Sequence, residues 1–210
     1  TVEKREGVYK TKSRAAEKVE IVDLPGVYSL SPYTPEEVVS RNFMIDGQPD
    51  LVINIVDATN LERNLYLTTQ VLEADVPVLV ALNMTDVVER DGDVIDAGKL
   101  ESELGVPVVP ISALKGAGVD KMMERALSAP RERSGVTVLG KALSDKLDGA
   151  LEFYKGEGVK SPLFHAVKLL ENDETELMRA GAKEVAQKIG AGEDTEAAVV
   201  DERYKYIVAK

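Results

Sequence analysis

Short apolar runs recur along the first 130 residues and alternate with stretches of helical periodicity. The runs are rich in Val, Ile and Leu without polar alternation, which is typical of strands buried on both faces of a sheet. They lie at residues 18–24, 50–58, 76–83 and 106–112, and a more polar run at 5–13 predicts an edge strand. This alternation predicts an α/β fold with a mostly parallel sheet and flanking helices.

Helix start and stop signals lie between these runs. The sequence "TPEE" at 34–37 predicts a capping box, with Thr34 as the N-cap and Glu37 as its partner. The same Thr-x-x-Glu spacing recurs in "TNLE" at 59–62, where it predicts a second capping box. Two further helices are predicted at 97–104 and 118–128.

The pattern changes after residue 130, because the remaining chain carries helical patterns and no convincing strand. Helices are predicted at 161–172 with Ser161 as N-cap, at 173–189 with Asp173 and Glu176 in capping-box spacing, and at 194–210. We therefore expect two domains, an α/β domain over residues 1–130 and a small all-α subdomain over residues 137–210.

Composition narrows the classes of function. Of 210 residues, 44% are hydrophobic and 30% charged, as in soluble globular proteins, and no apolar run approaches the roughly 20 residues of a membrane span. The net charge of −11 disfavours nucleic acid as a main partner, because binding to phosphates needs a basic face. The chain has no Cys and one His, so a metal site built from thiolate or imidazole ligands is not expected.

Polar residues follow three of the predicted buried strands. The sequences "DLPG" at 23–26, "NMTD" at 83–86 and "SAL" at 112–114 each come at a strand end, where parallel sheets deliver functional residues. In this order they match the DxxG, NKxD-like and SA motifs of guanine-nucleotide-binding GTPases. Each motif alone is weak, and a helix cap is the simpler interpretation of an isolated NxxD, but the ordered set is a strong joint signal.

Each motif has a chemical reason. Asp23 offers the oxygen ligands that Mg²⁺ prefers, through a water, and Gly26 lets a backbone N–H approach a γ-phosphate closely. The Asp86 carboxylate presents two acceptors to the N1–H and N2–H₂ groups of guanine, whereas adenine presents an acceptor at N1 and is rejected. Asn83 is expected to tie the base loop together and reach the base, and the Ala113 N–H is expected to meet guanine O6.

Several stretches of the chain resemble the cytosolic GTPase domain of ferrous iron transport protein B. They are "TVEKREG", "DLPGVYSLSPYTPEE", "VDATNLERNLYLTTQVLE", "VALNMTD" and "LGVPVVPISA". The Met in "NMTD" stands where most GTPases have Lys and is typical of that family, and "NLERNLYLT" is more distinctive than any nucleotide motif. The C-terminal helices, ending in "DERYKYI", resemble the helical domain that follows the GTPase domain in this family.

The resemblance implies GTP or GDP, Mg²⁺ and K⁺ as ligands of the intact domain. Thr1 matches the switch I threonine that coordinates Mg²⁺ beside the triphosphate, and Asp23 matches the start of switch II, where it binds Mg²⁺ through water. The implied nucleotide contacts are Thr1, Val2, Glu3, Asp23, Leu24, Pro25, Gly26, Asn83, Met84, Thr85, Asp86, Ser112, Ala113 and Leu114.

One departure from the family pattern is large. The family begins with a phosphate loop of the GxxxxGK[ST] type, and this sequence has no match to it. The missing part includes a central strand between the strands that end at Asp23 and Asp57, so we expect a gap with two unpaired strand edges. We therefore expect a chain truncated within switch I, consistent with its lack of an initial Met, that binds GTP poorly or not at all on its own.

Other polar residues receive simpler interpretations. Val27 stands where many GTPases carry a water-positioning Gln, so hydrolysis is expected to be slow or to use a backbone group or a monovalent cation, and no general base is assigned. Asp57 is predicted to serve as a turn or cap residue, and Glu62 and Arg63 as cap and surface-pair residues. His165 is predicted to be a packed or exposed helix residue rather than a metal ligand.

The leading hypothesis is a GTP-binding and GTP-hydrolysing regulatory domain of a prokaryotic ferrous iron transporter. It would lie at the cytoplasmic face of the membrane, joined to the membrane transport domain of the same parent chain, with hydrolysis in the intact parent and none in this chain alone. The alternatives are a soluble GTPase of the ribosome-assembly or tRNA-modification type and a non-hydrolysing interaction module. The sequence leaves the oligomeric state open.

Overall fold

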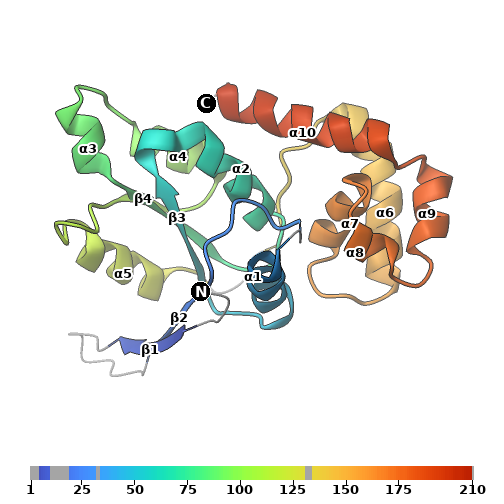
Figure 1. Ribbon diagram of the computed structural model, residues 1–210, viewed down its shortest axis with the longest axis horizontal. Coiled ribbons are helices and arrows are strands. Elements are labelled where there is room, and N and C mark those ends of the chain that lie inside the picture. Colours follow the sequence, from blue (N-terminus) through green and yellow to red (C-terminus); the bar gives the residue numbers. More distant parts are fainter. Residues whose placement is uncertain (1–4, 10–18, 32–33, 131–133, 210) are drawn as a thin grey trace.

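The computed structural model describes residues 5–9, 19–31, 34–130 and 134–209. Figure 1 shows an α/β part with parallel strands, a cluster of helices beside it, and a C-terminal helix that runs from this cluster back across the α/β part. The predicted switch I residues Thr1, Val2 and Glu3 lie outside the described residues.

The strands form two sheets. The main sheet is parallel and has the order β3 (Val52–Asp57), β4 (Val78–Asn83) and β5 (Val108–Pro110). β1 (Arg5–Tyr9) and β2 (Val19–Asp23) form a separate antiparallel pair. The predicted α/β class is confirmed. Because β2 and β3 belong to separate sheets and Ile55 in β3 is 63% exposed, the arrangement fits the expected gap between these two strands.

Helices cover both faces of the main sheet. They are α1 (Pro35–Asp46), α2 (Leu61–Val71), α3 (Thr85–Arg90), α4 (Ala97–Leu104) and α5 (Val119–Ser128), with a 3-10 turn, η1 (Ala58–Asn60), before α2. Val80 and Leu82 of β4 pack in a core with α1, α2 and α4, whereas Leu79 and Ala81 pack with α5 on the opposite face. Figure 1 shows α2 and α4 above the strands and α5 below them.

The two predicted capping boxes have different outcomes. At α1 the box is confirmed, because Thr34 Oγ1 accepts from the Glu37 N–H at 3.3 Å and Glu37 Oε2 accepts from the Thr34 N–H at 3.0 Å. The box at 59–62 is wrong. Asp57, at the end of β3, accepts from the Thr59 N–H at 2.8 Å and caps η1, so the α-helix begins later, at Leu61. The predicted cap role of Asp57 is confirmed.

The C-terminal part is helical. It contains η2 (Lys141–Leu143), α6 (Ser144–Gly156), α7 (Pro162–Leu170), α8 (Glu174–Leu177), α9 (Ala182–Ile189) and α10 (Glu193–Val208). The single helix predicted at 173–189 is wrong, because the chain turns between α8 and α9, where Gly181 has φ +77°. None of the helices in the described ranges combines the length and apolar composition that a membrane crossing needs.

Ser161 is the N-cap residue of α7, but its side chain makes no hydrogen bond to the first turn of that helix. Its backbone has φ +52°, and its hydroxyl accepts from the Asp75 N–H, 3.0 Å away in the α/β part. The predicted N-cap position is therefore confirmed, but the side-chain cap is absent because a partner distant in the sequence binds the hydroxyl.

Two clusters of buried charges join the helical part to the α/β part. In the first, the Arg203 cluster, Arg203 of α10 lies 2.8 Å from both Glu73 and Glu171, and it donates to Thr69 of α2 at 2.9 Å. Arg203 and Glu73 are fully buried. A buried charge is stable only with partners, so these side chains fix α10 against the α/β part.

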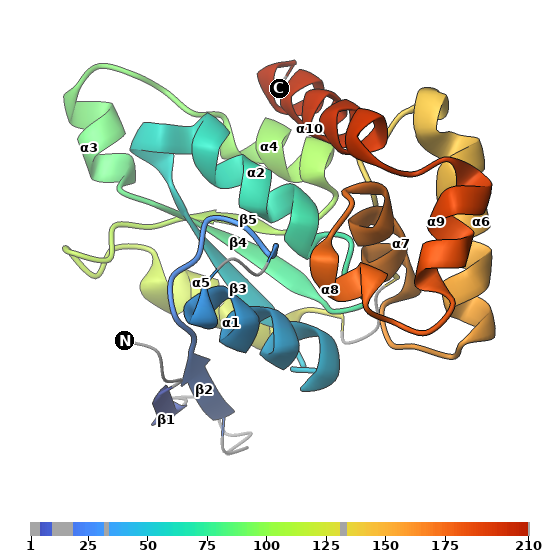
Figure 2. The ribbon, with the colours of Figure 1, turned by 45° about the vertical axis from the view of Figure 1, so that its right-hand side comes forward.

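The second cluster, the Arg41 cluster, contains Arg41, His165, Asp173 and Glu176. Arg41 of α1 contacts Asp173 at 3.0 Å and pairs with Glu176 of α8. His165 Nδ1 lies 2.9 Å from Glu176, and His165 is 3% exposed, as expected of a packed helix residue. Figure 2 shows α7 and α8 facing α1, where these side chains meet.

The Arg41 cluster makes stability depend on pH. Burial alone would raise the pKa of Glu176, but the hydrogen bond and charge of His165, followed by the charge of Arg41, outweigh burial and lower it below 4.5. The unfolded chain therefore takes up this proton at a higher pH than the folded chain. The stabilisation is fully present above about pH 4.5 and is lost as the pH falls through the folded-state pKa.

We expect the free energy of unfolding to fall more steeply below pH 4.5 in the parent sequence than in Glu176→Gln, which lacks this titrating group. Urea unfolding between about pH 6 and about pH 3.5 measures both slopes. The variant is expected to start from a lower stability, so the comparison concerns the slope alone. Equal slopes would show that Glu176 does not cause the acid sensitivity.

Candidate functional site

The carboxyl ends of the main-sheet strands lie at one edge. In the strand register Asp57 of β3 is opposite Asn83 of β4, and Leu82 of β4 is opposite Pro110 of β5. The "NMTD" and "SAL" segments therefore leave the sheet side by side, as expected for functional residues of a parallel sheet.

Hydrogen bonds tie these two segments together. Asn83 Oδ1 accepts from the Ala113 N–H at 2.9 Å, and Thr85 Oγ1 donates to the Ile111 carbonyl at 3.0 Å. Met84 has φ +66°, a left-handed conformation that turns the chain from β4 into α3. This bond joins the two segments as predicted for Asn83, and the contact of Asn83 with a base stays a prediction.

The segment 112–114 presents its three residues differently. Ser112 is 3% exposed and its backbone pairs with Ala117, whereas Leu114 is 93% exposed. The Ala113 N–H, which was predicted to meet guanine O6, donates to Asn83 in this conformation. A contact between Ala113 and a base would have to share or replace that bond.

Asp86 lies in the first turn of α3 and faces Lys115. The Lys115 Nζ is 3.0 Å from Asp86 Oδ2, and the two side chains are 63% and 20% exposed. The hydrogen bond from Lys115, together with its positive charge, lowers the pKa of Asp86, so this carboxylate is charged at neutral pH. Lys115 was not among the predicted site residues, although it directly follows "SAL" in the sequence.

The "DLPG" segment leaves β2 and enters a loop at 24–31 that contacts several helices. Ser40 of α1 donates to the Pro25 carbonyl at 2.9 Å. Lys168 of α7 donates to Ser31 at 3.0 Å, so the helical part also touches this loop.

Asp23, predicted to bind Mg²⁺ through water, is the exposed last residue of β2. Leu24 is half-buried in the loop that follows, and Gly26 is exposed. Within the part of the chain that the structure describes, no group of three or more His, Asp or Glu residues is arranged to hold a metal ion. The Mg²⁺ role of Asp23 stays a prediction.

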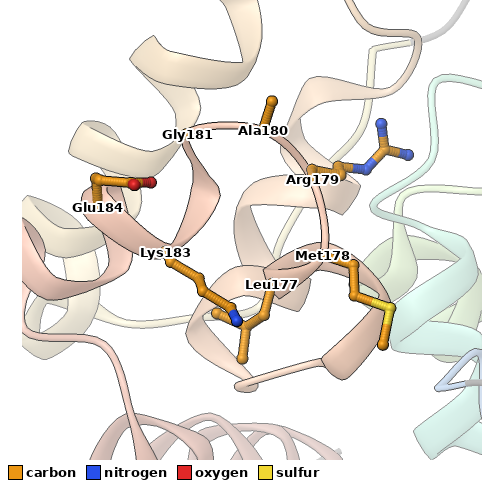
Figure 3. A pocket seen from close by; sticks show the side chains of 7 residues that line it. All are labelled: Leu177, Met178, Arg179, Ala180, Gly181, Lys183 and Glu184. Atoms are coloured by element: carbon orange, nitrogen blue, oxygen red, sulfur yellow. The ribbon is translucent and has the colours of Figure 1, made fainter.

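A shallow hollow of about 400 Å³ lies elsewhere, at the turn between α8 and α9. Figure 3 shows the residues that line it, which are Leu177, Met178, Arg179, Ala180, Gly181, Lys183 and Glu184. It belongs to the helical part, on the opposite side of the molecule from α3 in Figure 1, and contains none of the predicted site residues.

The family model described as ferrous iron transport protein B matches residues 1–126, more than half of the chain. The chain belongs to the ferrous iron transport protein B family. The matched range contains "DLPG", "NMTD", "SAL" and the "NLERNLYLT" segment, so the motifs that carried the resemblance of the α/β domain lie within it, whereas "DERYKYI" of the C-terminal helices lies beyond it.

Other proteins of this family are similar over the full length of the chain. The Fe(2+) transport protein A/Fe(2+) transporter FeoB fusion protein of Porphyromonas gingivalis is 34% identical over 99% of the chain. These curated relatives are much longer than the chain. The chain spans only about a quarter of their length, 27% in the case of the fusion protein.

Solved structures have the same fold. NFeoB from S. thermophilus bound to GDP.AlF4⁻ and K⁺ is 39% identical, with a TM-score of 0.88 over 100% of this chain and 85% of that one. The cytosolic domain of L. pneumophila FeoB is 34% identical, with a TM-score of 0.86 over 100% of this chain and 84% of that one. The helical part is thus shared along with the α/β part.

Proposed function

We propose that this chain is the guanine-nucleotide-reading part of a ferrous iron transporter's regulatory domain. The observation that carries the proposal is the joining of "NMTD" to "SAL" at the sheet edge, through the bond from Ala113 to Asn83 and the pairing of Lys115 with Asp86. Family membership supplies the connection with ferrous iron transport.

Base selection follows from the charge of Asp86. Its two carboxylate oxygens accept from guanine N1–H and N2–H₂, while adenine presents a lone pair at N1 and is repelled. A site built around paired hydrogen bonds to one ligand discriminates strongly against a ligand that lacks them. Asn83, Met84 and Thr85 shape the loop around the base, and Ser112, Ala113 and Leu114 form its other wall.

The phosphate side of the proposal involves the described loop at 24–31 and residues outside the described ranges. Asp23 would hold Mg²⁺ through water, Thr1 with Val2 and Glu3 would supply the switch I ligand, and the backbone from Leu24 through Pro25 to Gly26 would contact the γ-phosphate. Val27 cannot orient water by a hydrogen bond, so hydrolysis is slow or uses a backbone group or a cation. The S. thermophilus neighbour was solved with GDP.AlF4⁻ and K⁺, which supports GTP hydrolysis with K⁺ as that cation.

The proposed place of the chain is the cytoplasmic face of a membrane, and its proposed partner is the membrane transport domain of the same parent protein. The description of the L. pneumophila neighbour as a cytosolic domain supports this placement. The helical subdomain, proposed to span residues 137–210, relays switch movements from the α/β domain at 1–130. The contacts of Lys168 and of the two charged clusters with the α/β part support that role.

Nucleotide titration of the full-length protein tests the proposal. We expect GDP and a non-hydrolysable GTP analogue to bind about 100-fold or more tightly than ADP. Equal affinity for guanine and adenine nucleotides would reject it. Mass spectrometry of the purified 210-residue chain tests the interaction-module alternative, because retained GDP would contradict that alternative.

Lys115 is expected to compete with guanine for Asp86. Replacing Lys115 with Ala removes the competitor, so GDP affinity is expected to rise a few-fold in a fluorescence titration of the full-length protein. Lys155→Ala, on an exposed position of α6, changes the net charge equally and is expected to leave the affinity unchanged. A lower affinity in Lys115→Ala would instead mean that Lys115 binds the nucleotide.

A further inference from the structure

The start of α2 contacts the loop at 24–31. The Arg63 guanidinium carbon lies 4.2 Å from the centroid of the Tyr28 ring, a distance typical of a cation over an aromatic face. Tyr28 is 65% exposed, so little else covers this ring. Arg63 was predicted to form a surface ion pair, and the structure assigns it this stacking contact instead.

A second residue of α2 contacts the same loop. Gln70 Oε1 accepts from the Leu30 N–H at 2.6 Å and from the Ser29 hydroxyl at 3.3 Å. Gln70 and Leu30 are buried. Residues 63 and 70 are seven positions apart, which places them two turns apart on one face of the helix. One face of α2 therefore contacts the loop at Tyr28 and again at Ser29 and Leu30.

The first turn of α2 is fixed to the edge that carries the base loop. Asn64 Oδ1 accepts from the Asp57 N–H at 3.4 Å, and Asn64 Nδ2 donates to the Asn60 carbonyl at 2.9 Å. Asp57 lies opposite Asn83 in the strand register. The segment 60–64, "NLERN", thus joins the end of β3 to a helix face that contacts the loop after "DLPG".

We propose that Arg63 and Gln70 are positioning residues that hold the loop at 24–31, and with it Gly26 and Val27, in place for nucleotide hydrolysis. This inference rests on the proposed function. Neither residue touches the nucleotide; Arg63 acts through Tyr28, the neighbour of Val27, and Gln70 acts through the Leu30 backbone. The contact between Arg63 and Tyr28 lies on the surface, so a substitution can remove it without disturbing the core. The hydrogen bond of Gln70 is buried.

The stack can be measured without nucleotide. The 210-residue chain has no Trp, so Tyr28→Trp introduces a single fluorophore that retains an aromatic face for Arg63. Adding Arg63→Ala is expected to lower the time-resolved fluorescence anisotropy of this Trp on the nanosecond scale, because the ring loses its cover. Arg63→Lys is expected to retain part of the effect, and Glu62→Ala, exposed in the same turn, is expected to leave the anisotropy unchanged.

Steady-state kinetics of the full-length protein test the consequence. Arg63→Ala is expected to lower kcat for GTP about 2- to 5-fold with little change in KM, the range that follows from the strength of an exposed cation–π contact. Arg63→Lys is expected to recover part of kcat. An unchanged or raised kcat in Arg63→Ala, or unchanged anisotropy in the Trp reporter, would overturn the inference.

The inference and the proposed function fail in different ways. If the full-length protein binds and hydrolyses GTP but Arg63→Ala behaves as the parent does, the positioning role is wrong and the proposed function stands. If no variant binds guanine nucleotide, the proposed function is wrong and the role in hydrolysis falls with it. The anisotropy comparison then still reports whether Arg63 orders the loop.

Discussion

Replacing Arg203 with Met is expected to lower the free energy of unfolding by about 3–5 kcal/mol, the usual cost of leaving buried charges without a partner. For a chain of this size that loss lowers Tm by about 6 to 20 °C. Glu73 is fully buried, and burial raises its pKa even though Arg203 opposes that rise. Without Arg203, Glu73 and Glu171 would face each other with one counter-charge fewer. Urea unfolding and calorimetry measure the loss.

Two further variants distinguish the effect of unpaired buried carboxylates from a general effect of substitutions in α10. Lys205→Met removes a cation from the same helix at a position that is 64% exposed, and its stability is expected to match the parent. Adding Glu73→Leu to Arg203→Met removes an uncompensated carboxylate, so the double variant is expected to recover part of the loss. No recovery would assign the effect of Arg203→Met to lost packing rather than to unpaired charge.

Replacing Asp86 with Asn is expected to reduce GDP affinity of the full-length protein about 100-fold or more and to raise affinity for xanthosine diphosphate. Asn keeps one acceptor for N1–H but presents an NH₂ donor where guanine also has a donor. Xanthine carries a carbonyl oxygen at that position and accepts this bond. Competition titration with the two diphosphates measures the change in preference.

Asp91→Asn is the matched control, because it makes the same chemical change at an exposed carboxylate that pairs with Arg90 beyond the end of α3. Its nucleotide affinities are expected to match those of the parent. Equal weakening of both diphosphates in Asp86→Asn, with no gain for xanthine, would mean that Asp86 supports the loop without reading the base.

Local signals in the sequence were reliable where the partners are close along the chain. The capping box of Thr34 and Glu37 depends on residues three apart, and it forms as predicted. The run at 76–83 became the buried central strand because both of its faces are apolar. The capping box predicted at 59–62 was wrong because Asp57, two residues before Thr59, accepts from the Thr59 N–H and caps a 3-10 turn there instead.

For the candidate site, too, the sequence showed the local segments, and only the structure showed the contacts between them. Its residue types and order, from "DLPG" to "SAL", are readable because each motif is a short segment at a strand end. The bond from Ala113 to Asn83 joins residues 30 apart, and Lys115 reaches Asp86 from a different loop. A lysine after "SAL" is ordinary in an exposed loop, so its pairing was not visible before the strands were placed side by side.

The sequence by itself determined the family, the α/β class and the helical C-terminal part, and it supplied the residues that we propose read guanine. The tertiary structure decided which charges are buried together and which helix holds the loop after "DLPG". Arg203 pairs with Glu73, which is 130 positions away in the sequence. Arg63 of α2 stacks on Tyr28 of the loop at 24–31. The physical reason is that propensity and periodicity act between near neighbours, whereas the pairing of long side chains depends on how whole helices pack.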